Sequence, residues 1–265
     1  MKIAFIGSGK MAEALIARLT SHRIIIADID RSRLKSLNGK YAAKIASNNQ
    51  QAANAAEVVI LAVKPQQLAG VLDEIGGNGA GKRNKLIISI AAGIPLAYLQ
   101  KKLPGYPIVR VMPNNPCLVG AGMSALAKGR GVAPKQFKLA ESIFKLVGET
   151  VVVPEKLLDA VTGLSGSGPA YIYAVLEALI DGGKKVGLPG PLAKKLALQT
   201  VFGAAQTAKE SRIEPRVLRE MVTSPGGTTM EGLAVLKARK VQEAFVAAVS
   251  AATQKSKVLS KRWAI

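Results

Sequence analysis

Residues 2–12 read Lys2-Ile3-Ala4-Phe5-Ile6-Gly7-Ser8-Gly9-Lys10-Met11-Ala12, and this stretch decides how the first half of the chain folds. The apolar run before the glycines has the length and composition of a buried strand. After it, apolar residues at helical spacing predict a helix from Met11 to Leu19. A G-x-G-x-x-G/A pattern that joins a strand to a helix is the fingerprint of a turn holding the pyrophosphate of a dinucleotide.

Each small residue of this turn has a physical task. Gly7 permits the tight turn, and Gly9 lets a pyrophosphate approach the backbone. Ala12 stands where the pattern more often has a third glycine and still allows the helix to pack closely on the strand. The start of the helix adds amide donors and a partial positive charge.

Strand and helix patterns alternate over the first 155 residues, which is typical of a doubly wound, mainly parallel sheet covered by helices. A further amphipathic helix is expected from Pro134 to Leu146. The expected strands are Lys2–Ile6, Ile24–Asp28, Val58–Val63, Leu86–Ala91, Pro107–Met112, a run near Met123–Ala127, and Thr150–Val153.

No strand pattern follows Ser165, so we expect an all-α second half and divide the chain into domains 1–160 and 161–265. The expected helices are Pro169–Val186, Gly190–Ser211, Arg216–Val222, Thr228–Lys237 and Val241–Leu259. These helices are apolar around much of their circumference, and so short a domain has little interior in which to bury them. The sequence therefore predicts a homodimer formed through the C-terminal helices, with a larger assembly open.

Composition excludes several classes of protein. The chain has 265 residues, of which 49% are hydrophobic and 20% charged, as expected for a packed protein rather than a disordered one. Its longest apolar runs are too short for a membrane span, and its first residues lack the pattern of a secretory signal, so we expect a cytoplasmic protein without membrane association. The formal charge of +20 is spread along the chain and aromatic residues are only 4%, so we expect no nucleic-acid partner.

The single cysteine and single histidine limit the chemistry. A single cysteine, Cys117, cannot form an internal disulfide. Cys117 and His22 together are too few ligands for a Cys/His metal site, so we expect no metal. Cys117 follows a proline in an apolar stretch and is predicted to be a small buried side chain. His22 lies in a polar loop before a strand, where a catalytic role is not expected.

Recognition of the cofactor ribose is ambiguous at the end of the second strand. Asp28 stands where an acidic residue hydrogen-bonds a ribose diol and repels a 2′-phosphate. Asp30, Arg31 and Arg33 follow closely, and an arginine there could hold that phosphate. Asp28 and Asp30 could also merely cap the next helix. The sequence thus leaves NADH and NADPH both open.

The second half carries one informative loop, Thr223-Ser224-Pro225-Gly226-Gly227-Thr228-Thr229-Met230-Glu231. Thr228 and Glu231 have the spacing of a capping box, which predicts a helix beginning at Thr228. Exposed backbone N–H groups from Gly226 to Thr229, with the hydroxyls of Ser224 and Thr229, could cradle an anion such as a carboxylate. The residues alone leave this site and an ordinary capped helix equally open.

Taken together, the motifs resemble those of pyrroline-5-carboxylate reductases over essentially the whole chain. They are Gly7–Ala12, Ala62–Gln66, Arg110–Pro116, Thr162–Tyr171, Asp181–Gly183 and Ser224–Thr229, in the family's order. The resemblance implies a Rossmann domain, an interlocking helical dimerisation domain, and reduction of a cyclic imine to L-proline by NADH or NADPH, the last step of proline biosynthesis.

The resemblance also implies roles for individual residues. The implied cofactor-binding residues are Gly7, Ser8, Gly9, Lys10, Met11, Asp28, Arg31, Asn49, Ala62, Val63, Lys64 and Pro65, with Pro113 and Asn114 near the nicotinamide. Ser224 and the backbone of Gly226, Gly227 and Thr228 would bind the substrate carboxylate. Thr229 would hydrogen-bond the ring nitrogen, which makes it the candidate catalytic residue. Ile213-Glu214-Pro215 departs from the Glu-His-Pro segment found in many members.

Two other interpretations compete with this one. A β-hydroxyacid dehydrogenase would carry a Gly-x-Gly-x-x-x-Lys pattern on its first interdomain helix. Here Ile172 stands four positions after Gly168, in place of that lysine. A dinucleotide-binding sensor without turnover has the same fold class, because fold does not determine function.

Overall fold

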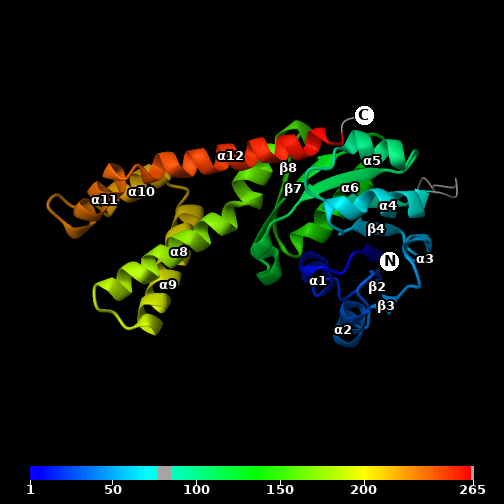
Figure 1. The fold of residues 1–265 in the computed structure, drawn as a ribbon, viewed down its shortest axis with the longest axis horizontal. Coiled ribbons are helices and arrows are strands. Elements are labelled where there is room, and N and C mark those ends of the chain that lie inside the picture. The colour runs from blue at the N-terminus through cyan, green and yellow to red at the C-terminus, as the bar shows by residue number, and fades with distance from the viewer. Residues whose placement is uncertain (77–84, 264–265) are drawn as a thin grey trace. The chain divides into compact units, whose positions relative to one another are not determined.

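A computed structural model describes residues 1–76 and 85–263. The chain divides into two compact units, each described here by itself. The first unit comprises residues 1–167 together with 250–265, and the second comprises residues 168–249. The domain boundary expected at residue 160 stays a prediction, and nothing in the sequence had indicated that residues 250–265 pack with the first unit. Figure 1 shows both units along the coloured chain.

The first unit is built on one sheet. Its strands are β1 (Lys2–Ile6), β2 (Arg23–Ala27), β3 (Lys44–Ile45), β4 (Val58–Leu61), β5 (Leu86–Ser89), β6 (Ile108–Met112), β7 (Gly122–Lys128) and β8 (Gly148–Val152). Their order in the sheet is β3-β2-β1-β4-β5-β6-β7-β8. The part from β3 to β6 has the strand order of doubly wound dinucleotide-binding sheets. The predicted fold class of this half is confirmed.

Two features of the sheet were not predicted. β7 runs antiparallel to β6, whereas the other pairs in the described sheet are parallel. Hydrophobic patterning reports which residues are buried and carries no signal for strand direction, so this reversal was not visible. β3 has only two residues, both exposed, at the edge of the sheet. An exposed edge pair has no apolar pattern from which to predict it.

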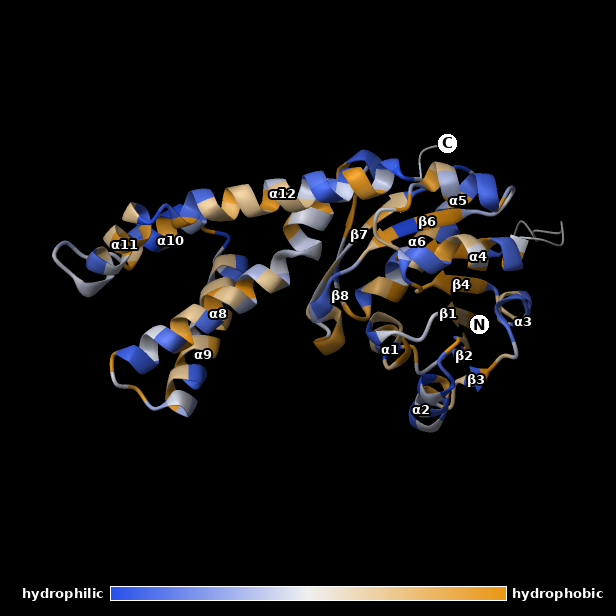
Figure 2. Ribbon diagram, in the orientation of Figure 1, coloured by the Kyte–Doolittle hydropathy of each residue, from blue (hydrophilic) through white to orange (hydrophobic). Residues whose placement is uncertain are grey.

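Both faces of the sheet are covered, which explains why its strands are apolar at successive positions. On β1, Ile3 and Phe5 belong to one buried cluster, and Ala4 and Ile6 belong to the other. The first cluster is covered by α1 (Lys10–Ile16), α2 (Arg31–Tyr41) and α6 (Pro134–Lys145). The second is covered by α3 (Asn49–Ala55), α4 (Pro65–Gly76) and α5 (Leu96–Lys102). In Figure 2 the strand β4 is correspondingly orange.

The end of the chain is tied to this unit. The carboxylate of Asp159, in the short helix α7 (Leu158–Val161), accepts hydrogen bonds from the Ser256 hydroxyl at 2.7 Å and the Ser260 hydroxyl at 3.0 Å. The rings of Tyr98 and Trp263 pack edge to face, with their centroids 4.9 Å apart. These contacts give residues 250–263 a buried side in the first unit.

The second unit is helical, as predicted. It contains α8 (Gly168–Lys185), α9 (Gly190–Ser211), α10 (Pro215–Met221), α11 (Thr228–Ala238) and the beginning of α12 (Val241–Lys261). In the described part of the chain no strand follows Val152. No described helix is both long enough and apolar enough to cross a membrane.

This second unit has almost no core of its own. Its buried apolar side chains, among the described residues, are Ala193 and Ala197 on α9. Large apolar side chains are exposed instead, including Phe202 at 61% and Val246 at 62%. In Figure 2 orange and tan segments recur along α8, α9 and α12. An apolar surface of this kind marks an interaction site.

Candidate functional site

The glycine turn is constructed by close backbone contacts. The N–H of Gly7 donates to the carbonyl oxygen of Ala27 at the end of β2, at 2.9 Å. Gly7 has a φ of +97°, and a Cβ added there would lie 2.6 Å from the carbonyl carbon and oxygen of Ala62. Only glycine fits such a position, because it has neither the steric penalty of positive φ nor a side chain to place. The turn therefore joins the carboxyl ends of β1, β2 and β4.

Gly9 differs from Gly7 in having open space above it. A Cβ added at Gly9 would meet nothing within 4 Å. Gly9 is also the N-cap of α1, and no side chain caps the first N–H groups of that helix. Lys10 and Met11 form the first turn of α1, next to this opening. A bare backbone facing open space is what a pyrophosphate needs, so the residues present fit a dinucleotide.

Asp28 anchors the same turn from the end of β2. One carboxylate oxygen accepts the Ser8 N–H at 2.6 Å and the Ser8 hydroxyl at 2.7 Å, and the other accepts the Asp30 N–H at 2.9 Å. Partial burial alone would raise the pKa of Asp28, but the hydrogen bonds from Asp30 and Ser8 outweigh it and hold the pKa below its ordinary value. Asp28 is therefore a fixed negative charge, and the fully buried Ser8 faces this carboxylate.

The charged residues that follow Asp28 have different contacts. Asp30 caps α2 by accepting the N–H groups of Ser32 and Arg33, so of the two aspartates only Asp30 acts as a helix cap. Arg33 donates through Nε to the carbonyl oxygen of Ser8 at 2.8 Å, which holds the glycine turn from a second side. Arg31 lines one of two pockets that lie next to the glycine turn.

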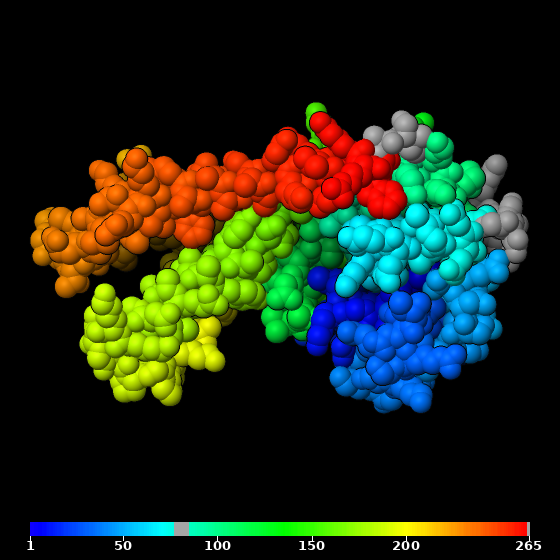
Figure 3. All heavy atoms as spheres, viewed as in Figure 1, coloured from blue at the N-terminus to red at the C-terminus, as the bar shows by residue number. Residues whose placement is uncertain are grey.

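Two adjoining pockets lie at the carboxyl ends of the strands. The glycine-loop pocket, of about 500 Å³, is lined by Gly7, Gly9, Ala27, Asp28, Ile29, Asp30, Arg33, Asn49, Ala62, Val63, Lys64, Gln67, Gly70, Val71 and Glu74. The β2-side pocket, of about 600 Å³, is lined by Ala27, Asp28, Ile29, Arg31, Leu34, Lys35, Ile45, Ala46, Ser47, Asn48, Asn49 and Glu74. Their shared residues make them one groove. In the space-filling view, the cyan atoms of α4 lie beside the blue atoms of the N-terminal segments (Figure 3).

The groove collects most of the residues that the sequence had assigned to a cofactor. Ala62, Val63 and Lys64 line it from the turn after β4, while Pro65 begins α4 behind them. Asn49, the first residue of α3, lines both pockets. A topological switch point, where successive strands turn to opposite sides, is the usual place for such a groove in an open α/β sheet.

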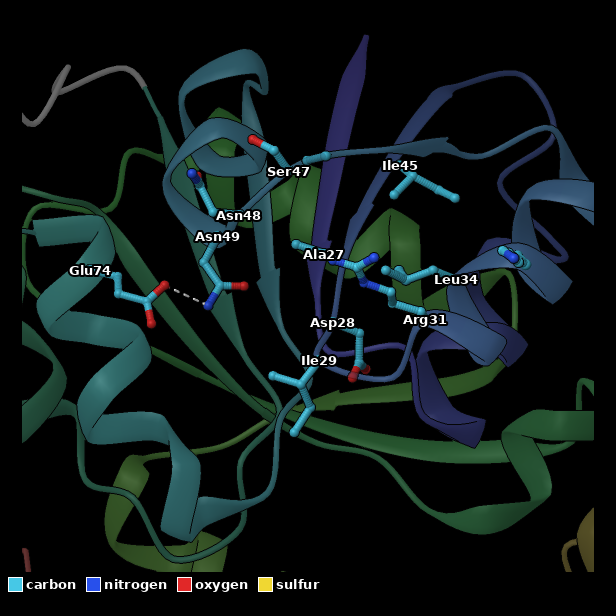
Figure 4. A pocket seen from close by; sticks show the side chains of 12 residues that line it. Ala27, Asp28, Ile29, Arg31, Leu34, Ile45, Ser47, Asn48, Asn49 and Glu74 are labelled. Carbon is cyan, nitrogen blue, oxygen red and sulfur yellow. Dashed lines mark hydrogen bonds between the residues drawn. The ribbon is translucent and has the colours of Figure 1, made fainter.

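Glu74 was missed by the sequence analysis. It lies near the end of α4, lines both pockets, and accepts a hydrogen bond from the Asn49 side-chain amide at 2.8 Å. Figure 4 shows Asn49 and Glu74 on one side of the pocket, Arg31 and Leu34 on the other, and Asp28 between them. No local motif marks Glu74, so only the fold could bring it to the site.

Asn114 follows the last strand residues of β6 closely and links neighbouring segments through two side-chain hydrogen bonds. Its side-chain oxygen accepts the N–H of Met123 at 2.8 Å, and its amide donates to the carbonyl oxygen of Ser165 at 3.1 Å. Pro113 is buried beside it, and neither residue lines the two pockets. The side chain of Asn114 thus holds β7 and the π-helical turn Thr162–Gly166 against the end of β6. Their predicted place near the nicotinamide stays a prediction.

The loop before α11 in the second unit is a tight turn. The N–H of Gly227 donates to the carbonyl oxygen of Ser224 at 3.0 Å, and Gly226 between them has a φ of +68°. Proline followed by a residue with positive φ is typical of a type II turn. A Cβ on Gly227 would lie 2.5 Å from the Ser224 hydroxyl oxygen. The turn therefore brings the Ser224 hydroxyl directly over the backbone of Gly227.

The start of α11 agrees with the sequence in position but not in capping. The helix begins at Thr228 as predicted, yet its N-cap is Gly227 and no side chain caps it. The capping box expected from Thr228 and Glu231 is wrong, because Thr228 is already the first helical residue. The N–H groups of Gly226, Thr228 and Thr229 donate to no backbone carbonyl in the turns, loops and helix caps of the described residues. These groups, on an exposed loop, remain available to an anion.

The remaining reactive side chain is a packing residue. Cys117 is 1% exposed, in the short 3-10 helix Asn115–Val119, and its burial raises the pKa of the thiol. A Cβ at the neighbouring Gly122 would overlap its sulfur. The prediction of a small buried side chain is confirmed. Among the described residues, no cluster of three or more His, Cys, Asp or Glu side chains could hold a metal.

The strand order, the glycine turn and the groove define a class: proteins with a Rossmann-type domain that binds a dinucleotide. Residues 2–93 match the family described as NADP oxidoreductase, coenzyme F420-dependent, and residues 155–259 match the family described as pyrroline-5-carboxylate reductase dimerisation. The chain is 46% identical over 268 residues to the pyrroline-5-carboxylate reductase of Synechocystis sp., covering 99% of both. It therefore belongs to the pyrroline-5-carboxylate reductase family.

Other relatives agree over nearly full length. The pyrroline-5-carboxylate reductase of Arabidopsis thaliana is 39% identical, covering 98% of this chain and 96% of the relative. The solved structure from Coxiella burnetii has a TM-score of 0.89 at 37% identity, covering 97% of this chain and 98% of the other. The Plasmodium falciparum structure, which has NADP bound, has a TM-score of 0.89 at 32% identity and covers 98% of both chains.

Proposed function

We propose that this chain reduces 1-pyrroline-5-carboxylate to L-proline with NADH or NADPH, the last step of proline biosynthesis. The observation that carries the proposal is full-length membership of the reductase family, combined with a chain that has both the dinucleotide groove and the Ser224–Thr229 loop. The β-hydroxyacid dehydrogenase alternative loses its support, because the family match extends through the helical half.

The groove has the task of holding the cofactor. Gly7, Gly9 and the start of α1 offer backbone to the pyrophosphate, while Asp28 and Asn49 lie on the ribose side. A reduced nicotinamide held in the groove would supply the hydride that the imine carbon gains, and a proton would be added at the imine nitrogen. Holding both reactants in the reacting geometry supplies much of the rate enhancement in such reactions.

The loop before α11 has the task of holding the substrate. The Ser224 hydroxyl and the N–H groups of Gly226 and Thr228 are donors for the substrate carboxylate. Gly227 contributes differently, because its N–H is bonded to Ser224 and its missing side chain makes room for the Ser224 hydroxyl. Thr229, an exposed residue on the first turn of α11, hydrogen-bonds the ring nitrogen and is the candidate that positions its proton.

The reaction is tested with purified protein and 1-pyrroline-5-carboxylate, with NADH and NADPH run in parallel. The expected result is a substrate-dependent loss of the reduced-nicotinamide absorbance and formation of proline. If both cofactors bind but neither is consumed, the substrate assignment falls and a dinucleotide-binding sensor replaces it.

The assembly follows from the exposed helices of the second unit. We propose a homodimer in which α8, α9 and α12 bury their apolar side chains, Phe202 and Val246 among them, against the partner. The family description of residues 155–259 as a dimerisation region supports this. Sedimentation at micromolar concentration should show a dimer or a multiple of it, and a folded monomer would contradict the proposal. The location of the protein in the cytoplasm stays a prediction.

A further inference from the structure

The choice between NADH and NADPH depends on the ribose side of the groove. The two cofactors differ by a 2′-phosphate, which carries close to two negative charges at neutral pH. The residues that line both pockets include two carboxylates, Asp28 and Glu74, and one amide, Asn49. An inference about them rests on the proposed use of a nicotinamide cofactor and deepens it.

Asp28 cannot turn away from a ligand without cost. Its carboxylate accepts three hydrogen bonds, two of which come from Ser8 in the glycine turn. Rotating the carboxylate would leave the buried N–H and hydroxyl of Ser8 without partners, which is unfavourable. A 2′-phosphate would therefore meet a negative charge that stays in place, whereas a ribose hydroxyl would find an acceptor.

Glu74 places a second carboxylate in the groove and accepts a hydrogen bond from Asn49, a neutral donor of the groove. One amide hydrogen of Asn49 is donated to Glu74 at 2.8 Å (Figure 4). An amide that faced a phosphate with its donors free would favour NADPH. Here that donor is directed to a carboxylate, and the carboxylate itself repels a phosphate.

The cations that line the β2-side pocket do not reverse this balance, and Lys64 lines only the glycine-loop pocket. Arg33 is engaged with the Ser8 carbonyl and lies 3.9 Å from Glu13. The β2-side pocket is lined by Arg31 and Lys35, which are matched one for one by the two carboxylates. A chain with a formal charge of +20 thus has a β2-side pocket whose lining carries no excess positive charge.

We infer that Asp28 and Glu74 together make this groove select the unphosphorylated ribose, so that NADH binds more tightly than NADPH, with Glu74 acting as a specificity-determining residue. Asp28 supplies the fixed acceptor for the ribose, and Glu74 repels the 2′-phosphate and withholds the Asn49 donor from it.

The experiment measures the dissociation constants of NAD⁺, NADP⁺, NADH and NADPH by calorimetry, without substrate, for the wild type and two variants. Glu74→Gln removes one negative charge but keeps an oxygen that can accept from Asn49. Asp73→Asn is the matched control, since it removes the same charge from the next residue of α4, where Asp73 pairs with Lys102 at 2.7 Å. Neither Asp73 nor Lys102 lines the groove.

The wild type should bind NADH more tightly than NADPH. Glu74→Gln should raise the affinity for NADPH relative to NADH about fivefold, the size expected for one charge acting on a phosphate across partly hydrated space. Asp73→Asn should leave the ratio within about twofold. The inference is overturned if the wild type binds NADPH at least as tightly as NADH, or if the two variants shift the ratio equally. Because binding is measured without turnover, an inactive protein would refute the proposed reaction and leave this result intact.

Discussion

Replacing Gly9 with alanine should abolish most cofactor binding while leaving the fold as stable as before. Gly9 has φ −65° and ψ 177°, which alanine adopts without strain, and no atom lies within 4 Å of the added Cβ. Restricting the unfolded chain stabilises by about 0.4–1 kcal/mol, and the poorer N-cap costs about 0.5 kcal/mol. The two nearly cancel, so the free energy of unfolding should change by less than about 0.5 kcal/mol.

The loss in affinity comes from the space that the methyl group fills. The Cβ extends about 1.5 Å from the Cα into the opening over the turn, where the pyrophosphate approaches the backbone. Displacing the phosphates from their backbone donors by this much should weaken binding about 10- to 100-fold, or about 1.4–2.7 kcal/mol. Calorimetry with NADH measures this loss, and urea denaturation without ligand measures stability.

Gly7→Ala is the matched comparison. At Gly7 the added Cβ would stand 2.6 Å from the Ala62 backbone, and φ is +97°. Strain and clash together should lower the free energy of unfolding by about 2–4 kcal/mol. A stable Gly9→Ala variant that binds NADH as the wild type does would refute the reasoning, since the open space over Gly9 would then not be the path of the pyrophosphate.

Three further variants probe other parts of the chain. Thr229→Ala should lower kcat/KM for the imine about 10- to 100-fold with cofactor affinity unchanged, and equal losses in both would remove Thr229 from its role. Glu155→Gln should reduce the free energy of unfolding by about 2 kcal/mol, because the Arg110 side chain, which is 7% exposed, would lose its charged partner at 3.0 Å. An unchanged midpoint of urea denaturation would show that this ion pair does not contribute to stability. The lowered pKa of Asp28 stabilises the fold above about pH 4, and this stabilisation is lost as the pH falls through the folded-state pKa. The urea midpoint should therefore drop more between about pH 6 and about pH 3 in the wild type than in Asp28→Asn, and parallel curves would contradict this role of Asp28.

The sequence was most informative where local chemistry leaves no choice. A glycine pair between an apolar run and a helical pattern predicted the turn at Gly7 and Gly9, and positive φ at Gly7 shows why only glycine fits. The helices of the second half were predicted to within one or two residues, since Gly and Pro mark their ends. β7 was located but not oriented, and β3 was missed for want of a buried pattern.

The candidate site was predicted only as far as motifs extend. Asp28 was identified by its position after β2, but its hydrogen bonds to Ser8 depend on how two distant segments meet. Glu74 carries no motif and reaches the groove because α3 and α4 pack side by side. The Thr228 capping box failed because its spacing does not say which residue is the N-cap.

The return of α12 to the first unit affects how the protein is made. Residues 250–265 complete a unit whose sheet lies in residues 1–167, and Asp159 and Tyr98 receive their partners Ser256 and Trp263 only from this segment. A ribosome synthesises the whole second unit before these partners exist. Until then the nascent sheet domain lacks these contacts, while helices with exposed apolar side chains emerge. The packing of the first unit is therefore completed only after the second unit has been synthesised.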